Sequence, residues 1–312
     1  MRLSRPGLSI SLAVALSLPV IGSASAATLD STTNGSLIVS AGQTTVAINP
    51  AGGSVTGTVA NGQQAVYSSD GKRIAYLYDN GPCVQQPEGG CVWQPDLMTS
   101  NADGTNQQLL VHAIQGEGDA TDDYVIHPDW SPNGKQIIFD SPHGLGMVNT
   151  DGTGLQTLTD GGDGKFSPAG GEIAFIRDTS YVAADGSTQY GPDVYVMDLA
   201  TRAVVQVTTD HQAWSTPLTW SPDGTRIVYA TQNGLNAIDV ATGQVTNLVD
   251  PTTWPTGLTD VQTPVFSPDG SQIAFSGYDP NAGVQGIYAV NADGSNFRTV
   301  AATGGTLTEW TE

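Results

Sequence analysis

The sequence is poor in positive charge. Its 312 residues include 10 Lys and Arg against 30 Asp and Glu, which gives a formal net charge of −20 at pH 7. A surface of this sign repels phosphate groups, so the composition argues against nucleic acid and anionic membrane surfaces as partners. It is compatible with good solubility and with binding of cations or of basic patches on other proteins.

Cysteine is also scarce, because Cys83 and Cys91 are the only two in the chain. A structural zinc site needs four ligands, so two cysteines alone do not provide one. An even pair within one short segment of an exported protein indicates a disulfide. We therefore expect a Cys83–Cys91 bond that fixes the shape of one loop.

Long hydrophobic runs are missing after the first 26 residues, which excludes a later membrane span. Residues 1–26 have the pattern of a signal peptide, with Arg2 and Arg5 ahead of an apolar core and Ala24-Ser-Ala26 as the cleavage site. An uncleaved anchor is the alternative, but the apolar run is short and Pro19 interrupts it. Cleavage leaves a single domain, 27–312, exported to the periplasm or the extracellular space, with 8 basic against 30 acidic residues and a charge of −22.

The sequence does contain one repeated motif. It consists of an aromatic residue, then Ser-Pro-Asp-Gly or a close variant, and then an apolar triplet. Its five copies begin at Tyr67, Trp130, Phe166, Trp220 and Phe266. Proline presets φ at the first central position of a tight turn and glycine supplies positive φ at its end, so each copy predicts strand, turn, strand. A period of roughly 40–50 residues with short strands predicts a β-propeller.

A second signature follows each copy, an apolar strand that runs into Asp-Gly, Thr-Gly or a similar turn, as in Met147–Gly152. Such a pattern predicts a hairpin and one further strand. Each unit therefore holds four antiparallel strands, which make one blade. By this pattern, the repeated serines and the Asp-Gly pairs are turn residues, and Gly161–Gly164 is a link between blades.

The two ends of the chain are expected to close the ring. Trp310 stands where a sixth copy of the motif would begin, and the segments 37–39, 45–48 and 55–59 have the composition of strands. We predict an all-β, six-bladed propeller whose last blade combines one C-terminal strand with three N-terminal strands. This closure removes a free sheet edge.

These motifs resemble those of the TolB-like β-propellers, whose blades carry W-S-P-D-G repeats. The resemblance covers almost the whole mature chain and implies contacts with other envelope proteins. Complete TolB proteins carry an α/β domain before the propeller. Only about forty mature residues precede the first copy here, and the ring needs them, so we expect that domain to be absent.

Loop length indicates where binding could occur, since long variable loops on a rigid scaffold commonly carry function. The turns within the motifs are short, whereas the connections on the opposite face are long, for example 79–95, 177–192 and 250–264. Candidate binding residues on this long-loop face are Trp93, Asp122, Asp123, His127, Asp210, His211, Trp214 and Trp254. The tryptophans either pack against the rim or form an exposed aromatic platform.

Three functions remain open from the sequence. An exported, monomeric interaction module for an envelope or extracellular protein is favoured, because no complete catalytic triad or metal set is evident. A polysaccharide lyase or hydrolase is the alternative, with His112, His127 and His211 as its histidines. A glycan-binding propeller is the third. We expect no obligatory cofactor, although the clustered carboxylates leave Ca²⁺ or another divalent cation open.

Overall fold

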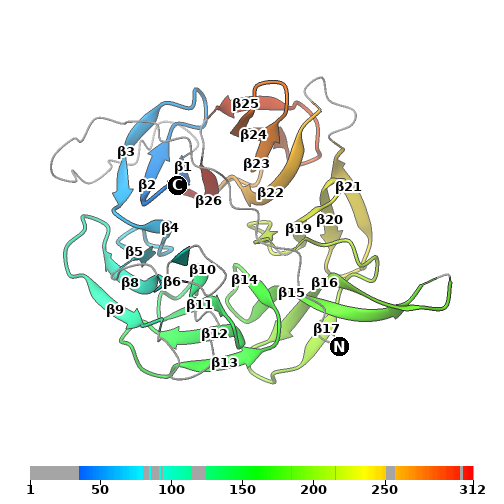
Figure 1. Cartoon of the computed structure of the whole chain (residues 1–312), viewed down its shortest axis with the longest axis horizontal. Coiled ribbons are helices and arrows are strands. Elements are labelled where there is room, and N and C mark those ends of the chain that lie inside the picture. The colour runs from blue at the N-terminus through cyan, green and yellow to red at the C-terminus, as the bar shows by residue number, and fades with distance from the viewer. Residues whose placement is uncertain are drawn as a thin grey trace.

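A computed structural model describes residues 35–79, 84–85, 91–92, 94–113, 124–183, 185–214, 216–250, 257–302 and 305–311. Every regular element in these ranges is a β-strand. Six four-stranded sheets are arranged around a central axis (Figure 1). No helix within these ranges is long and apolar enough to cross a membrane. The structure thus confirms the predicted six-bladed β-propeller.

We number the blades 1 to 6 in the order of the ring and give their strands from the axis outward. Blade 1 contains β26 (Thr306–Thr311), β1 (Ser36–Ala41), β2 (Thr44–Ile48) and β3 (Val55–Ala60). Blade 2 contains β4 (Gln63–Tyr67), β5 (Arg73–Tyr78), β8 (Asp96–Asn101) and β9 (Gln108–Val111). Blade 3 contains β10 (Ile126–Trp130), β11 (Gln136–Ser141), β12 (Gly144–Asn149) and β13 (Gln156–Thr159).

The remaining blades follow the same pattern. Blade 4 contains β14 (Gly162–Phe166), β15 (Glu172–Val182), β16 (Thr188–Asp198) and β17 (Val204–Gln206). Blade 5 contains β18 (Thr219–Trp220), β19 (Arg226–Thr231), β20 (Gly234–Asp239) and β21 (Val245–Val249). Blade 6 contains β22 (Thr259–Phe266), β23 (Gln272–Asp279), β24 (Val284–Asn291) and β25 (Arg298–Ala301). A separate two-stranded ribbon pairs β6 (Val84–Gln85) with β7 (Cys91–Val92).

The closing blade joins the two ends of the chain as predicted. Strand β26 lies beside β1 and pairs antiparallel with it (Figure 1). In this pairing Leu37 is opposite Trp310. The Thr308 hydroxyl lies 3.1 Å from the carbonyl oxygen of Ile38 and 2.9 Å from that of Ala65, so it can donate to either. Blade 1 is therefore fastened both within itself and to blade 2.

The repeated motif forms a tight turn held by its serine. In blade 5 the Ser221 hydroxyl donates to Asp223 Oδ1 at 2.6 Å, while Ser221 Oγ accepts the backbone N–H of Arg226 at 2.9 Å. Gly224 closes the turn with a φ of 72°, where a side chain would be strained. Hydrogen bonds from Ser221 and Thr225 lower the pKa of Asp223 to about 2. The serines are structural, as the sequence predicts.

The hydrophobic core is divided among the contacts between neighbouring blades, which we call seams. Among the described residues there are six clusters, and each joins the facing sides of two adjacent blades. At seam 3–4, for example, Leu145 packs with Phe166 and Phe175. Consecutive apolar residues in the strands therefore face two neighbours at once, which explains why the triplets do not alternate with polar residues.

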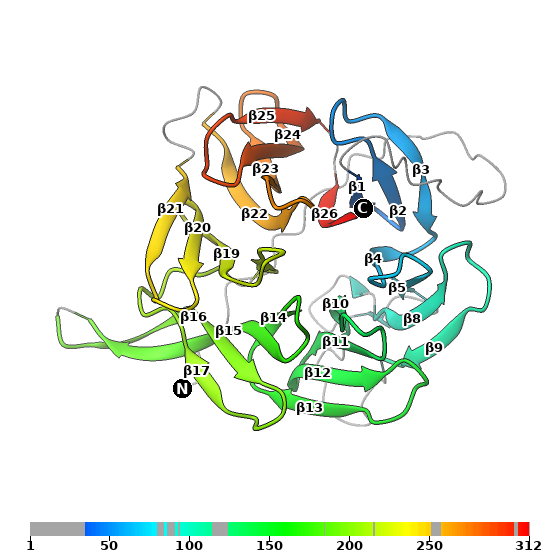
Figure 2. The ribbon, with the colours of Figure 1, turned by 180° about the vertical axis from the view of Figure 1, so that it is seen from behind.

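The prediction of a long loop over 177–192 is wrong. Strands β15 and β16 continue as a paired ribbon to Val182 and Thr188, and this ribbon extends outward from the ring (Figure 2). Exposure alternates along residues 177–182, which is the pattern of a strand. Likewise, β23 and β24 pair as far as Asp279 and Val284, so the connection between them is short.

Candidate functional site

The innermost strands share an irregularity that shapes the channel wall. Three residues before the repeat aromatic, Gln64, His127, Asp163 and Thr263 have φ values of 50–58°. In each of these strands the pairing register shifts at the same place. Such β-bulges redirect side chains, and non-glycine residues adopt positive φ only where the surroundings enforce it. The chain thus places selected polar residues at the axis at a cost in backbone strain.

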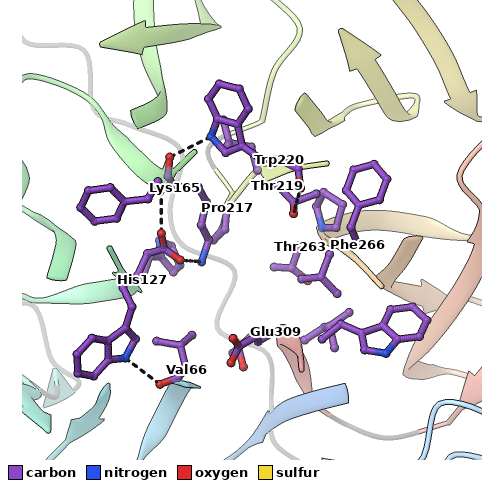
Figure 3. Close-up of a pocket in the computed structure, with 18 of the residues that line it drawn as sticks. Val66, His127, Lys165, Pro217, Thr219, Trp220, Thr263, Phe266 and Glu309 are labelled. Carbon is purple, nitrogen blue, oxygen red and sulfur yellow. Dashed lines mark hydrogen bonds and ion pairs between the residues drawn. The ribbon is translucent and has the colours of Figure 1, made fainter. Parts of the chain in front are cut away.

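A cavity of about 340 Å³ lies within the ring, and all six innermost strands contribute to its lining (Figure 3). Its wall is largely apolar, with the repeat aromatics and the motif prolines at its side. The apolar lining residues include Val66, Trp130, Phe166, Trp220, Phe266 and Trp310. A hollow of this volume is within the range of pockets that bind small ligands or single side chains of a partner.

Two of the ionisable residues in this wall form an ion pair. Lys165 Nζ lies 2.9 Å from Asp129 Oδ1, and the two side chains are 16% and 19% exposed. Asp129 Oδ2 also accepts the backbone N–H of Phe166 at 2.9 Å. Asp129 belongs to blade 3 and both of its partners to blade 4. The ion pair therefore links blades 3 and 4. It also places two charged side chains in the largely apolar cavity wall.

Glu309 makes the corresponding contact at seam 1–2, where its Oε2 accepts the backbone N–H of Tyr67 at 2.7 Å. Burial raises the pKa of Glu309 to about 7, although the Tyr67 hydrogen bond and the charge of Lys165 partly oppose the shift. Burial and the nearby Glu309 charge together raise the pKa of Tyr67 to about 12. A carboxyl group in the cavity wall thus changes charge near neutral pH.

The repeat tryptophans hold neighbouring blades together. Trp130 Nε1 donates to the carbonyl oxygen of Val66, and Trp220 Nε1 donates to that of Lys165, each at 3.1 Å (Figure 3). In both cases the acceptor is one residue before the repeat aromatic of the preceding blade. These tryptophans therefore have a structural role, and both also line the cavity.

A second polar group lies at seam 3–4 beside the cavity. His127 Nδ1 is 2.9 Å from Asp140 Oδ2 and 3.0 Å from Asp163 Oδ1. Burial opposes protonation of His127, but hydrogen bonds and negative charge from Asp140 and Asp163 outweigh it and raise its pKa to about 10. Burial and the Asp140 charge raise the pKa of Asp163. Within the described ranges, these three residues form the one group of His, Cys, Asp or Glu side chains arranged for metal binding.

The other two candidate histidines each pair with a different aspartate. His112 Nδ1 lies 2.6 Å from Asp96 Oδ1, and His211 Nδ1 lies 2.6 Å from Asp193 Oδ2. The His211 ring also stacks on Tyr181 of the extended ribbon, with 4.0 Å between ring centroids. Neither His112 nor His211 joins His127 in the group described above. The structure thus shows three separate histidine–aspartate contacts.

The structure locates four of the predicted binding residues. His127 lies in the cavity wall, whereas Asp210, His211 and Trp214 do not line it. Trp214 packs against the apolar cluster of blades 5 and 6, in keeping with the packing alternative for the tryptophans. The other four, and with them the predicted disulfide, depend on positions outside the described residues: Trp93, Asp122, Asp123, Trp254 and Cys83. Cys91 is described only through the backbone pairing of β7.

Sequence reasoning missed Asp140, Asp163, Lys165 and Glu309. Asp163 lies in the Gly161–Gly164 segment, which the structure shows to enter strand β14 and which is therefore not merely a link. Asp140 follows an apolar triplet at a position that Leu77 and Ile176 occupy in neighbouring blades. An aspartate in that register was a readable signal, because a charged residue rarely replaces a buried apolar one without a partner.

Comparisons with known proteins agree with this architecture. Residues 180–287 match the family described as the dipeptidyl peptidase IV (DPP IV) N-terminal region. The Tol-Pal system protein TolB of Francisella tularensis subsp. mediasiatica (strain FSC147) is 28% identical over 261 residues, covering 64% of this chain and 54% of that protein. The chain thus spans about half the length of the curated relatives it matches.

Solved structures also match the chain in fold. TolB from Acinetobacter baumannii superposes with a TM-score of 0.62 at 16% identity, covering 88% of this chain and 66% of that one. An oligogalacturonate lyase in complex with manganese has a TM-score of 0.50 at 15% identity, covering 81% of this chain and 73% of that one. Its fold, with a cavity on the axis, places this chain in the class of six-bladed β-propellers. Within that class, the chain resembles the TolB propellers in sequence and in fold.

Proposed function

We propose that the protein is an exported interaction module whose partner protein inserts a short segment into the axial cavity. The observation that carries the proposal is the cavity wall itself, which combines repeat aromatics and prolines with the charged residues Asp129, Lys165 and Glu309. Apolar surface supplies affinity for a buried side chain, and a few fixed polar groups supply orientation. The relatives carry the name Tol-Pal system protein, which supports a partner within a multiprotein system.

Export is part of this proposal and is supported by the sequence of residues 1–26. An envelope or extracellular protein is accordingly the expected partner, and the chain is expected to act as a monomer. Amino-terminal sequencing of the protein recovered from the periplasm or culture medium tests the export step. A mature protein that begins at Ala27 is the expected result, and retention of Met1 would contradict it.

The partner site can be tested by filling the cavity. Thr219 lines it, so Thr219→Trp should occupy the hollow and reduce capture of the partner in a crosslinking pull-down from envelope extract by at least tenfold. Val245→Trp, on the outer strand of the same blade where Val245 is 40% exposed, is the matched control and should leave capture unchanged. Both variants are first checked for wild-type thermal unfolding.

The long-loop face remains a competing location for the contact. Trp214→Ala removes an aromatic side chain that does not line the cavity. Loss of capture in Trp214→Ala together with full capture in Thr219→Trp would reject the cavity and favour the loops. Incubation with oligogalacturonate and other polysaccharides, followed by detection of new reducing or unsaturated ends, tests the enzymatic alternative.

A further inference from the structure

The group His127, Asp140 and Asp163 joins two blades with ionisable side chains, whereas neutral side chains make the equivalent contact elsewhere in the ring. Asp140 pairs with Ile126, the residue before His127, and Ser276 of blade 6 pairs in the same register with Gln262, the residue before Thr263. The two seams therefore have equivalent positions that can be compared directly.

At seam 6–1, neutral groups make the equivalent contacts. Thr263 Oγ1 donates to Ser276 Oγ at 2.9 Å, and Ser276 Oγ accepts the backbone N–H of Leu307 at 2.9 Å. At seam 3–4, Asp140 contacts His127 and accepts the backbone N–H of Asp163, 2.8 Å from Oδ2. A serine is thus sufficient to join two blades here, and structure alone does not require a carboxylate.

At seam 3–4, one carboxylate oxygen among the described residues lacks a hydrogen-bond donor. The single hydrogen on His127 Nδ1 can be donated to Asp140 Oδ2 or to Asp163 Oδ1, but not fully to both. Among the described residues, Asp163 Oδ1 has no well-aligned donor, although its side chain is only 8% exposed. A buried polar atom of this kind requires a partner, and a cation satisfies two carboxylates at once.

We propose that His127 Nδ1, Asp140 and Asp163 bind a divalent transition-metal ion, with Zn²⁺ as the best fit. The three ligand atoms lie within 4.8 Å of one another. Ligands about 2.1 Å from a tetrahedral zinc ion are about 3.4 Å apart, so each of the two oxygens needs to lie only about 0.4–0.5 Å farther from Nδ1. The separation of 2.9–3.0 Å is therefore close to that of a loaded site.

The donor set also distinguishes between cations. Ca²⁺ prefers six to eight oxygen ligands, which one imidazole and two carboxylates do not supply. An imidazole nitrogen with two carboxylates suits Zn²⁺ or a similar ion and compensates its charge. His127 is 23% exposed and lines the cavity, so the ion would be reached from the channel. Three protein ligands leave a fourth position for water or for a group that enters the cavity.

Metal titration of the tag-free, chelator-treated protein tests the proposal. We expect one equivalent of Zn²⁺ to bind in calorimetry and in competition with a chromophoric chelator, with at least tenfold weaker binding by His127→Gln and by Asp163→Asn. His112→Gln, which removes a histidine from another histidine–aspartate contact, is the matched control and should bind as the wild type does. Co²⁺ should give a visible absorption spectrum that Zn²⁺ abolishes.

Three results would overturn the proposal: no stoichiometric Zn²⁺ binding by the wild type, equal binding by His127→Gln, or Ca²⁺ binding at this site as tightly as Zn²⁺. Because Asp163→Asn could disturb the seam, circular dichroism and thermal unfolding of each variant accompany the titration. Anomalous diffraction from a zinc-soaked crystal of the wild type locates the ion without any substitution, and a peak away from His127 rejects the site. None of these measurements depends on the partner, so the cavity and metal proposals fail independently.

Discussion

Seams 3–4 and 6–1 join their blades through the same geometry but with different chemistry. At seam 6–1, Ser276 links Thr263 and Leu307 through neutral hydrogen bonds. At seam 3–4, Asp140 links His127 and Asp163 through charged ones. In a repeat protein the position of a contact follows from the fold, so a change of residue type at one copy is the informative feature. The comparison therefore separates the scaffold from the candidate site.

Seams 3–4 and 1–2 differ in a second way. Asp129 and Glu309 occupy the same position of the repeat, and each accepts the backbone N–H of the next blade's aromatic residue. Asp129 has Lys165 as a counterion at 2.9 Å. Glu309 has no ion pair of this kind among the described residues, and burial raises its pKa to about 7. The same contact thus has a lysine counterion at one seam and a carboxyl group with a raised pKa at the other.

Replacing Asp140 at seam 3–4 and Ser276 at seam 6–1 by alanine should give the largest difference in the free energy of unfolding. Asp140→Ala leaves the buried backbone N–H of Asp163 unsatisfied and disrupts a buried charged group, which should lower the free energy of unfolding by about 2–4 kcal/mol. Ser276→Ala should cost about 1–2 kcal/mol. Urea unfolding followed by tryptophan fluorescence, in EDTA, measures both. Equal costs would contradict a special character of seam 3–4.

Lys165→Gln should have the next largest effect. It leaves Asp129 without its counterion in a setting where the lysine and aspartate side chains are 16% and 19% exposed. We expect a loss of about 1–3 kcal/mol in the free energy of unfolding, less than for a fully buried pair. The double variant Lys165→Gln, Asp129→Asn should recover part of the loss. A double variant no more stable than Lys165→Gln would show that the pair contributes little.

Glu309 should make stability depend on pH in a defined direction. Between about pH 4.5 and 7 the folded protein holds a proton on Glu309 that the unfolded chain has released, so stability falls as pH rises through this interval. With allowance for partial exposure, the loss should be on the order of 1–2 kcal/mol. Glu309→Gln should flatten this part of the profile of melting temperature against pH. An unchanged slope would assign the dependence to other groups.

The smallest effect is expected from an ion pair on the surface. Lys72 Nζ and Asp70 Oδ2 are 3.8 Å apart, with side chains 80% and 55% exposed. Lys72→Ala should change the free energy of unfolding by less than about 0.5 kcal/mol, because water screens the pair. The same urea experiment provides the measurement. A cost similar to that of Lys165→Gln would mean that burial does not explain the difference between the two pairs.

The repeats made the fold readable from the sequence. Each Ser-Pro-Asp-Gly copy encodes its own turn, and the position of Trp310 predicted that a C-terminal strand closes the ring, which its pairing with β1 confirms. The extended ribbon was not predicted, because residues 177–182 are mostly polar and their alternating exposure is visible only in the structure. Local patterns thus predicted the blades well and their outer edges less well.

The candidate site was only partly readable. His127 was predicted as a binding residue of the long-loop face, but its partners Asp140 and Asp163 come from two different blades. Their proximity depends on the angle between the blades and on the bulges at His127 and Asp163, which no local pattern encodes. Alignment of the copies would have marked Asp140 as an exception beside Leu77 and Ile176, although it would not have shown that Asp140 and Asp163 share one histidine.

The construction of blade 1 has a consequence for how the protein matures. Thr308 contacts Ile38, which is 270 residues away in sequence, so this sheet cannot assemble before nearly the whole polypeptide is present. A chain still threading through a translocation channel would hold an open arc with unsatisfied strand edges, vulnerable to proteases and to mispairing. Ring closure therefore depends on a full-length chain. A prematurely terminated product lacks β26, so the edge of its strand β1 stays unpaired.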